Sequence, residues 1–161
     1  MAAPHTERFV LLVDDEEVVL EVFRRTFKER HGFLLDPTNN LKDALDKVAV
    51  FAYDALILDM AFPEGGDGME ILRAVRYHEM DNYAWRQRLM NEARLLGGGQ
   101  FVSMPQSHSS AFILTGSITP RDLLLDARAM GIRELIVKPT EFTEPFAHRV
   151  IDKISVDLGN A

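Results

Sequence analysis

The sequence contains no cysteine, no long apolar run and no excess of basic residues. Without cysteine there are no disulfides, which is compatible with the reducing cytoplasm where we expect the protein to work. The longest apolar runs span about five residues, far short of the roughly 20 needed to cross a bilayer, so we predict no membrane span. The net charge of −7 disfavours direct nucleic-acid binding, which uses a basic surface. We therefore expect a protein partner.

A dinucleotide-binding motif is also missing. No G-x-G-x-x-G follows the first apolar segment, residues 9–13, although such a motif is expected where a helix N-terminus holds a pyrophosphate. The 161 residues suffice for one domain with a substantial core. We expect residues 1–161 to form a single domain.

Four short segments are apolar on both faces, as central strands of a parallel sheet are, and each ends abruptly in polar or small residues. They are 9–13 followed by Asp14 and Asp15, 55–58 followed by Asp59, 111–114 followed by Thr115 and Gly116, and 135–137 followed by Lys138. The segments between these strands carry apolar residues at helical spacing and are predicted to be helices. Residues 33–35 are predicted to form a further strand. This alternation predicts an α/β fold with a doubly wound, five-stranded parallel sheet.

The carboxyl ends of parallel strands meet at one edge of the sheet, where open α/β proteins bind ligands. Two unit charges about 4 Å apart repel by roughly 4 kcal/mol at an effective dielectric of 20, so the three pairs formed by Asp14, Asp15 and Asp59 would cost on the order of 12 kcal/mol. That is comparable with the stability of a whole domain, so the carboxylates need a cation, a raised pKa or wider spacing. Carboxylate oxygens open to solvent suit Mg²⁺, and the Lys138 ammonium suits a phosphate. We predict a site that handles phosphoryl groups.

These motifs, in this order, resemble the receiver domain of bacterial two-component response regulators. The resemblance rests on Val-Asp-Asp-Glu at 13–16, Leu-Asp at 58–59 with Pro63 beyond it, Leu-Thr-Gly at 114–116 and Val-Lys-Pro at 137–139. It covers nearly the whole chain. It implies the flavodoxin-like strand order 2-1-3-4-5 and a cis peptide bond between Lys138 and Pro139.

The resemblance implies a metal site and a phosphoacceptor. Asp59 would accept a phosphoryl group from a histidine of a partner kinase or phosphotransfer protein. Asp15 and Asp59 would bind Mg²⁺ directly, together with the backbone carbonyl of Ala61, and Asp14 would act mainly through water. Such a protein is not an enzyme beyond promoting its own phosphorylation and dephosphorylation. Its effector would be a separate protein.

Four further residues have implied roles or depart from the pattern. Lys138 would pair with the phosphoryl oxygens, Thr115 would hydrogen-bond them, and Gly116 would leave room for Thr115 to move. Receivers usually carry an aromatic residue three positions before the lysine, and here that position is Leu135. The aromatic readout of phosphorylation is therefore absent, and the signal is expected to leave by another route.

Residues 77–110 also depart from the receiver pattern, as an insertion before the fourth strand. The part up to Leu96 is compatible with helix, so we expect an extended third helix or a helical insert, and Gly97 onward reads as a loop. Tyr83 and Trp85 favour a partner-binding or homodimer surface over an inert loop.

Two alternatives to the phosphoacceptor function stay open. A phosphorylation-independent interaction module would keep the fold and bind partners through residues 77–110. A phosphatase of the haloacid dehalogenase type is disfavoured, because it needs a second aspartate two residues after the nucleophile, where Ala61 stands.

Overall fold

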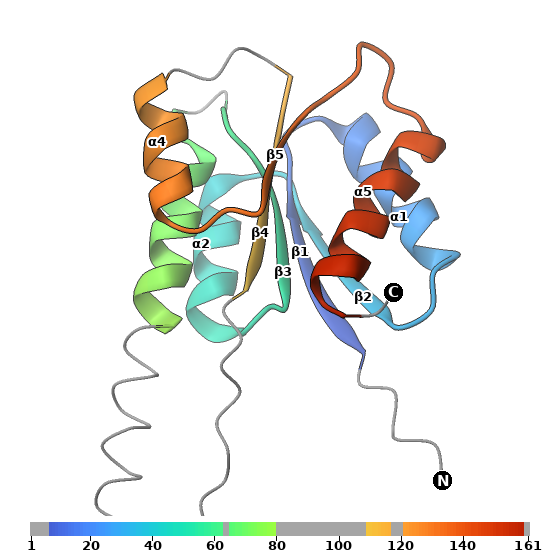
Figure 1. Cartoon of the computed structure of the whole chain (residues 1–161), viewed down its shortest axis with the longest axis horizontal. Helices are drawn as coiled ribbons and strands as arrows, with labels where there is room; N and C mark the ends of the chain where they lie inside the picture. Colours follow the sequence, from blue (N-terminus) through green and yellow to red (C-terminus); the bar gives the residue numbers. More distant parts are fainter. Residues whose placement is uncertain (1–6, 63–64, 80–108, 117–120, 160–161) are drawn as a thin grey trace, which may run out of the picture.

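The computed structural model describes residues 7–62, 65–79, 109–116 and 121–159 (Figure 1). Strands and helices alternate along these residues. In chain order they are β1 (Arg8–Val13), α1 (Glu17–Lys28), β2 (Phe33–Thr38), α2 (Leu41–Val50), β3 (Ala55–Asp59), a helix described over 68–79, β4 (Ser110–Thr115), α4 (Arg121–Ala129), β5 (Glu134–Val137) and α5 (Glu144–Asp157). Within the described part of the chain, no helix is both long and apolar enough to span a bilayer.

The five strands form one parallel sheet in the order β2-β1-β3-β4-β5. This confirms the predicted doubly wound, flavodoxin-like topology. The register pairs Val13 with Leu58 and Asp59 with Leu114. The last residues of β1, β3 and β4 therefore lie side by side at the carboxyl edge of the sheet.

Two apolar cores hold the helices onto the sheet, one on each face. Figure 1 shows α1 and α5 on one face and α2 and α4 on the other. Phe23 of α1 and Ile151 of α5 belong to the first core, whereas Leu72 of the helix 68–79 and Ala127 of α4 belong to the second. Every residue of β3 and β4 is buried, as expected of central strands covered on both faces. These strands give the carboxyl edge a rigid base.

Local interactions explain where two helices begin and how far the edge strand extends. The Asn40 side chain accepts a hydrogen bond from the Asp43 N–H at 2.7 Å, and this capping interaction begins α2. Thr143 caps α5 in the same way. β2 runs to Thr38 rather than ending near Leu35, because it is an edge strand, where Pro37 is tolerated.

The structure corrects one further expectation, because the peptide bond between Lys138 and Pro139 is trans, which is the intrinsically preferred form of an X-Pro bond. At the ends of the expected insertion, residues 77–79 continue the preceding helix and Ser110 begins β4. The insertion at 77–110 stays a prediction. The expected extended helix and the partner or homodimer surface fall on residues 80–108, outside the described residues.

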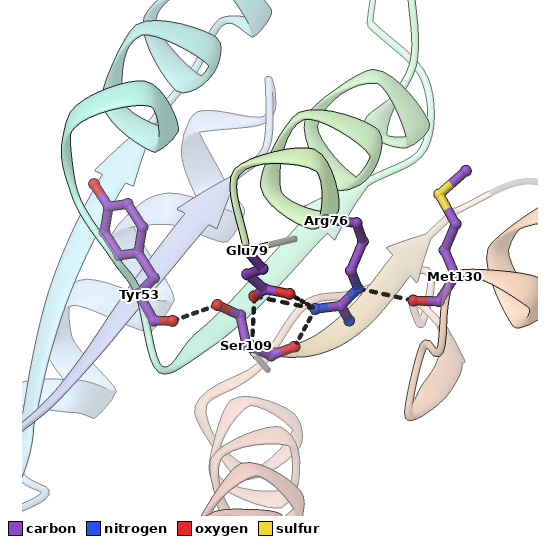
Figure 2. Close-up of polar contacts among 5 residues, drawn as sticks. All are labelled: Tyr53, Arg76, Glu79, Ser109 and Met130. Atoms are coloured by element: carbon purple, nitrogen blue, oxygen red, sulfur yellow. Dashed lines mark hydrogen bonds and ion pairs between the residues drawn. The ribbon is translucent and has the colours of Figure 1, made fainter. Parts of the chain in front are cut away.

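A partly buried polar cluster joins the end of the helix 68–79 to the start of β4 (Figure 2). The Arg76 guanidinium donates to Glu79 Oε2 at 2.9 Å and to the backbone carbonyls of Ser109 and Met130, both at 2.8 Å. The Ser109 N–H donates to Glu79 Oε1 at 2.7 Å, and the Ser109 hydroxyl donates to the Tyr53 carbonyl. This Arg76 cluster links the two chain segments that flank residues 80–108. It lies at the amino ends of the central strands, whereas Asp59 lies at their carboxyl ends.

Candidate functional site

Three carboxylates meet at the carboxyl edge of the sheet. Asp14 and Asp15 follow β1, and Asp59 ends β3. One oxygen from each of the three lies within 4.8 Å of the others. Asp14 and Asp59 are buried, whereas Asp15 is exposed. The convergence predicted from the strand ends is therefore present.

Lys138 reaches the same point from the end of β5. Its backbone N–H donates to the Thr115 carbonyl at 2.7 Å, which fixes the start of the loop after β5. Its Nζ lies 2.8 Å from Asp14 Oδ2 and 3.5 Å from Asp59 Oδ2, and its side chain is 5% exposed. A nearly buried ammonium thus offsets part of the negative charge.

Burial and repulsion from nearby carboxylates raise the pKa values of the two buried carboxyl groups at this site. Burial, a hydrogen bond with Asp15 and the charge of Asp14 raise the pKa of Asp59 to about 7, against which Lys138 acts only in part. Burial also raises the pKa of Asp14. The hydrogen bonds that Asp14 accepts from Lys138 and from the Glu16 N–H lower this pKa, but by less than burial raises it. For Lys138, burial would lower the pKa, but the pairs with Asp14 and Asp59 outweigh it and raise the pKa. The site is short of positive charge.

The residues present fit a hard divalent cation. The buried Asp14 Oδ2 atom makes no hydrogen bond of good geometry among the described residues, although Lys138 Nζ approaches it. The available ligand atoms are oxygens only, as Mg²⁺ prefers, and exposed Asp15 leaves the site open to the waters that Mg²⁺ retains. Ala61 is exposed and pairs with Asp67 in an isolated bridge, so the loop after Asp59 is held near the site.

The other predicted residues flank this cluster. Thr115 is buried at the end of β4, one residue beyond Leu114, which pairs with Asp59. Gly116 is exposed, and the Lys138 Cδ atom would lie 3.9 Å from a methyl group added to it. Leu135 is partly buried and packs against the core beneath α2 and α4.

Two residues contact the site in ways that their sequence motifs did not predict. Glu16, the last residue of the motif at 13–16, places Oε1 3.1 Å from Lys138 Nζ. Gly68 approaches the backbone of Asp59 so closely that an added Cβ would lie 2.3 Å from the Asp59 carbonyl oxygen. The Asp-Gly pair at 67–68 was a visible signal for a turn, but not for this contact.

The change Gly68→Ala should displace Asp59 and destabilise the domain. The added methyl group cannot fit without moving the Asp59 backbone, and forcing an extra methyl group into a packed site costs about 1–3 kcal/mol. Urea denaturation measures this loss. Gly116→Ala is the matched control for stability, because its methyl group meets only the Lys138 Cδ atom at 3.9 Å. Equal stability of the two variants would contradict the close approach.

Comparison with known proteins agrees with this geometry. Residues 10–84 match the family model of the response regulator receiver domain. The chain is 34% identical over 70 residues to the transcriptional regulatory protein ResD of Bacillus subtilis, covering 44% of this chain and 28% of that protein. It is also 34% identical over 83 residues to the hybrid signal transduction histidine kinase B of Dictyostelium discoideum, covering 50% of this chain and 4% of the kinase. The chain thus spans less than a third of either curated relative.

Solved structures share the fold. A CheY-like response regulator receiver domain protein from Methanospirillum hungatei superposes with a TM-score of 0.63 at 16% identity, over 95% of this chain and 94% of that chain. The response regulator TrrA from Thermotoga maritima, solved in complex with Mg²⁺ and BeF, gives a TM-score of 0.58 at 24% identity, over 91% and 98% of the two chains. Residues 10–84 are therefore similar in sequence to the response regulator receiver domain, and the chain shares the fold of solved receiver domains over most of its length.

Proposed function

We propose that this protein is the phosphoacceptor of a two-component system or phosphorelay, and that Asp59 receives the phosphoryl group. The observation that carries the proposal is the meeting of Asp14, Asp15 and Asp59 with Lys138 at one edge of the sheet. Receiver domains are signalling modules that act with histidine kinases or phosphotransfer proteins and with effectors. A histidine kinase or phosphotransfer protein is thus the proposed donor, and a separate protein is the proposed effector.

The transfer needs a nucleophile placed among positive charges. An Asp59 carboxylate oxygen forms a bond to phosphorus while the phosphorus–nitrogen bond of the donor phosphohistidine breaks, and the imidazole nitrogen keeps the electron pair. Lys138 Nζ, 3.5 Å from Asp59 Oδ2, is placed to pair with the transferred oxygens. Thr115 is the proposed hydrogen-bond donor to them. Phosphoryl transfer depends mainly on positioning and charge neutralisation.

The proposed Mg²⁺ ligands are Asp15, Asp59 and the backbone carbonyl of Ala61, with Asp14 acting through water. When bound, Mg²⁺ supplies charge neutralisation for the phosphoryl oxygens. Burial raises the pKa of Asp59 to about 7, and a bound Mg²⁺ would favour release of the Asp59 proton to solvent, which leaves the carboxylate that attacks phosphorus. The role of Asp14 is to orient Lys138, which it contacts at 2.8 Å.

Intact-protein mass spectrometry tests the proposal. The wild-type protein is incubated with phosphoramidate with and without Mg²⁺, beside Asp59→Asn and the surface control Asp46→Asn. The control removes a charge that pairs with exposed Lys42. We expect a Mg²⁺-dependent gain of one phosphoryl group in the wild type and in Asp46→Asn, and none in Asp59→Asn. A gain that persists in Asp59→Asn would overturn the assignment of the acceptor.

The second candidate function is an interaction module that works without phosphorylation. The replacement of the usual aromatic residue by Leu135 favours it, because the family's common readout is missing. Absence of phosphorylation with phosphoramidate and also with a histidine kinase would favour this alternative.

A further inference from the structure

Glu16 contacts the site lysine instead of capping its own helix. It occupies the N-cap position of α1, yet its side chain makes no capping hydrogen bond. Its backbone N–H donates to Asp14 Oδ1 at 2.9 Å, which holds the residue beside the site. Its Oε1 atom accepts a hydrogen bond from Lys138 Nζ at 3.1 Å. The neighbouring Glu17 points elsewhere and pairs with Arg24 at 3.0 Å.

The Lys138 ammonium is shared unequally among three carboxylates. Its distances are 2.8 Å to Asp14 and 3.1 Å to Glu16, but 3.5 Å to Asp59. An ammonium has three N–H donors, and the two shortest contacts belong to residues other than the proposed acceptor. The Glu16 side chain is 58% exposed, whereas that of Lys138 is 5% exposed, so Glu16 holds the ammonium from the solvent side.

We propose that Glu16 is a positioning residue that holds Lys138 away from Asp59 and competes with the phosphoryl group for its ammonium. This inference rests on the proposed phosphoacceptor function and deepens it. A phosphoryl group on Asp59 brings several anionic oxygens to the site, and Lys138 must turn from Glu16 to reach them. Glu16 thereby weakens the hold of the site on an anion, both by occupying a donor and by repelling the incoming charge.

The binding of beryllofluoride in saturating Mg²⁺ tests the competition. The variants are Glu16→Gln and the matched control Glu17→Gln, which removes the same charge one residue further along the same helix. Because an exposed ion pair contributes little, we expect Glu16→Gln to lower the half-saturating beryllofluoride concentration about two- to fivefold. Glu17→Gln should leave it unchanged. An unchanged or raised value in Glu16→Gln, or equal changes in both variants, overturns the proposal.

Nuclear magnetic resonance of the Lys138 side chain tests the contact itself, without Mg²⁺ or any phosphoryl analogue. The Lys138 ε-methylene and Nζ signals should shift in Glu16→Gln and stay in place in Glu17→Gln. If wild type binds no beryllofluoride while these signals behave as expected, the phosphoacceptor function fails and the Glu16–Lys138 contact stands. Signals that stay in place in Glu16→Gln show that Glu16 does not hold Lys138, whatever the phosphorylation result.

Discussion

Replacing Arg76 by alanine is expected to lower the free energy of unfolding by at most about 3–5 kcal/mol, the cost of removing one partner of a fully buried ion pair, because the pair of Arg76 with Glu79 is partly buried. Arg76 and Glu79 are only 17% and 18% exposed. The Arg76 guanidinium also bonds the carbonyls of Ser109 and Met130, so three acceptors lose a donor together. The Glu79 carboxylate would remain largely buried with the Ser109 N–H as a partner.

A second arginine on the same helix supplies the control. Arg73 lies one turn earlier and contacts Asp126 only at 4.0 Å, with 49% of its side chain exposed. Exposed pairs of this kind contribute about 0–1 kcal/mol, so Arg73→Ala should change the stability little. Urea denaturation of both variants in the full chain measures the difference. Similar losses in the two variants would show that the Arg76 cluster does not stabilise the domain.

The loss caused by Arg76→Ala should also depend on pH. Burial would raise the pKa of Glu79, but the hydrogen bond from the Ser109 N–H and the charge of Arg76 outweigh burial and lower it. A lowered pKa adds stability above the unfolded value of 4.5, and this stability is lost as the pH falls through the folded pKa. Without Arg76 this contribution shrinks. The stability gap between the wild type and the variant should therefore be widest near neutral pH and narrow below pH 4.5.

The site could be predicted because its residues mark the ends of strands. An apolar segment that stops at Asp59 or at Lys138 places those residues at the carboxyl edge of a parallel sheet, whatever the details of packing. The Arg76 cluster had no such marker. It depends on Ser109 meeting Glu79 across residues 80–108, a contact that neither periodicity nor spacing reveals.

The contacts of Gly68 and Glu16 near the site could not be predicted either, because they also depend on tertiary structure. The role of Gly68 follows from its distance to the Asp59 carbonyl, which depends on the path of the loop. The choice of Glu16 between a helix cap and Lys138 depends on the relative placement of β1 and β5, on opposite sides of β3 and β4. The local sequence determines which contacts such residues can make, and tertiary packing determines which of these contacts form.

Removing the Asp59 charge is expected to stabilise the protein in the absence of Mg²⁺. The folded pKa of Asp59 is about 7, raised from 3.8 mainly by burial. The folded state therefore binds more protons than the unfolded state between these values, so the contribution of Asp59 to stability is present below pH 4 and is lost as the pH rises through about 7. Asp59→Asn keeps a carbonyl oxygen for the hydrogen bond from the Met60 N–H and removes the titration.

The advantage of Asp59→Asn over the wild type should thus grow from pH 4 to pH 8. The upper bound of this advantage is on the order of 4 kcal/mol, the free energy that corresponds to raising the Asp59 pKa from 3.8 to about 7. Mg²⁺ should narrow this advantage, because it stabilises only a protein that binds it, by about 1.4 kcal/mol at ten times its dissociation constant. Thermal unfolding with and without Mg²⁺ measures both effects, with Asp46→Asn as the control for a lost surface charge. A wild type that is as stable as Asp59→Asn at pH 8 without Mg²⁺ would mean that Lys138 already neutralises Asp59. The metal would then be needed for the chemistry of the site rather than for its stability.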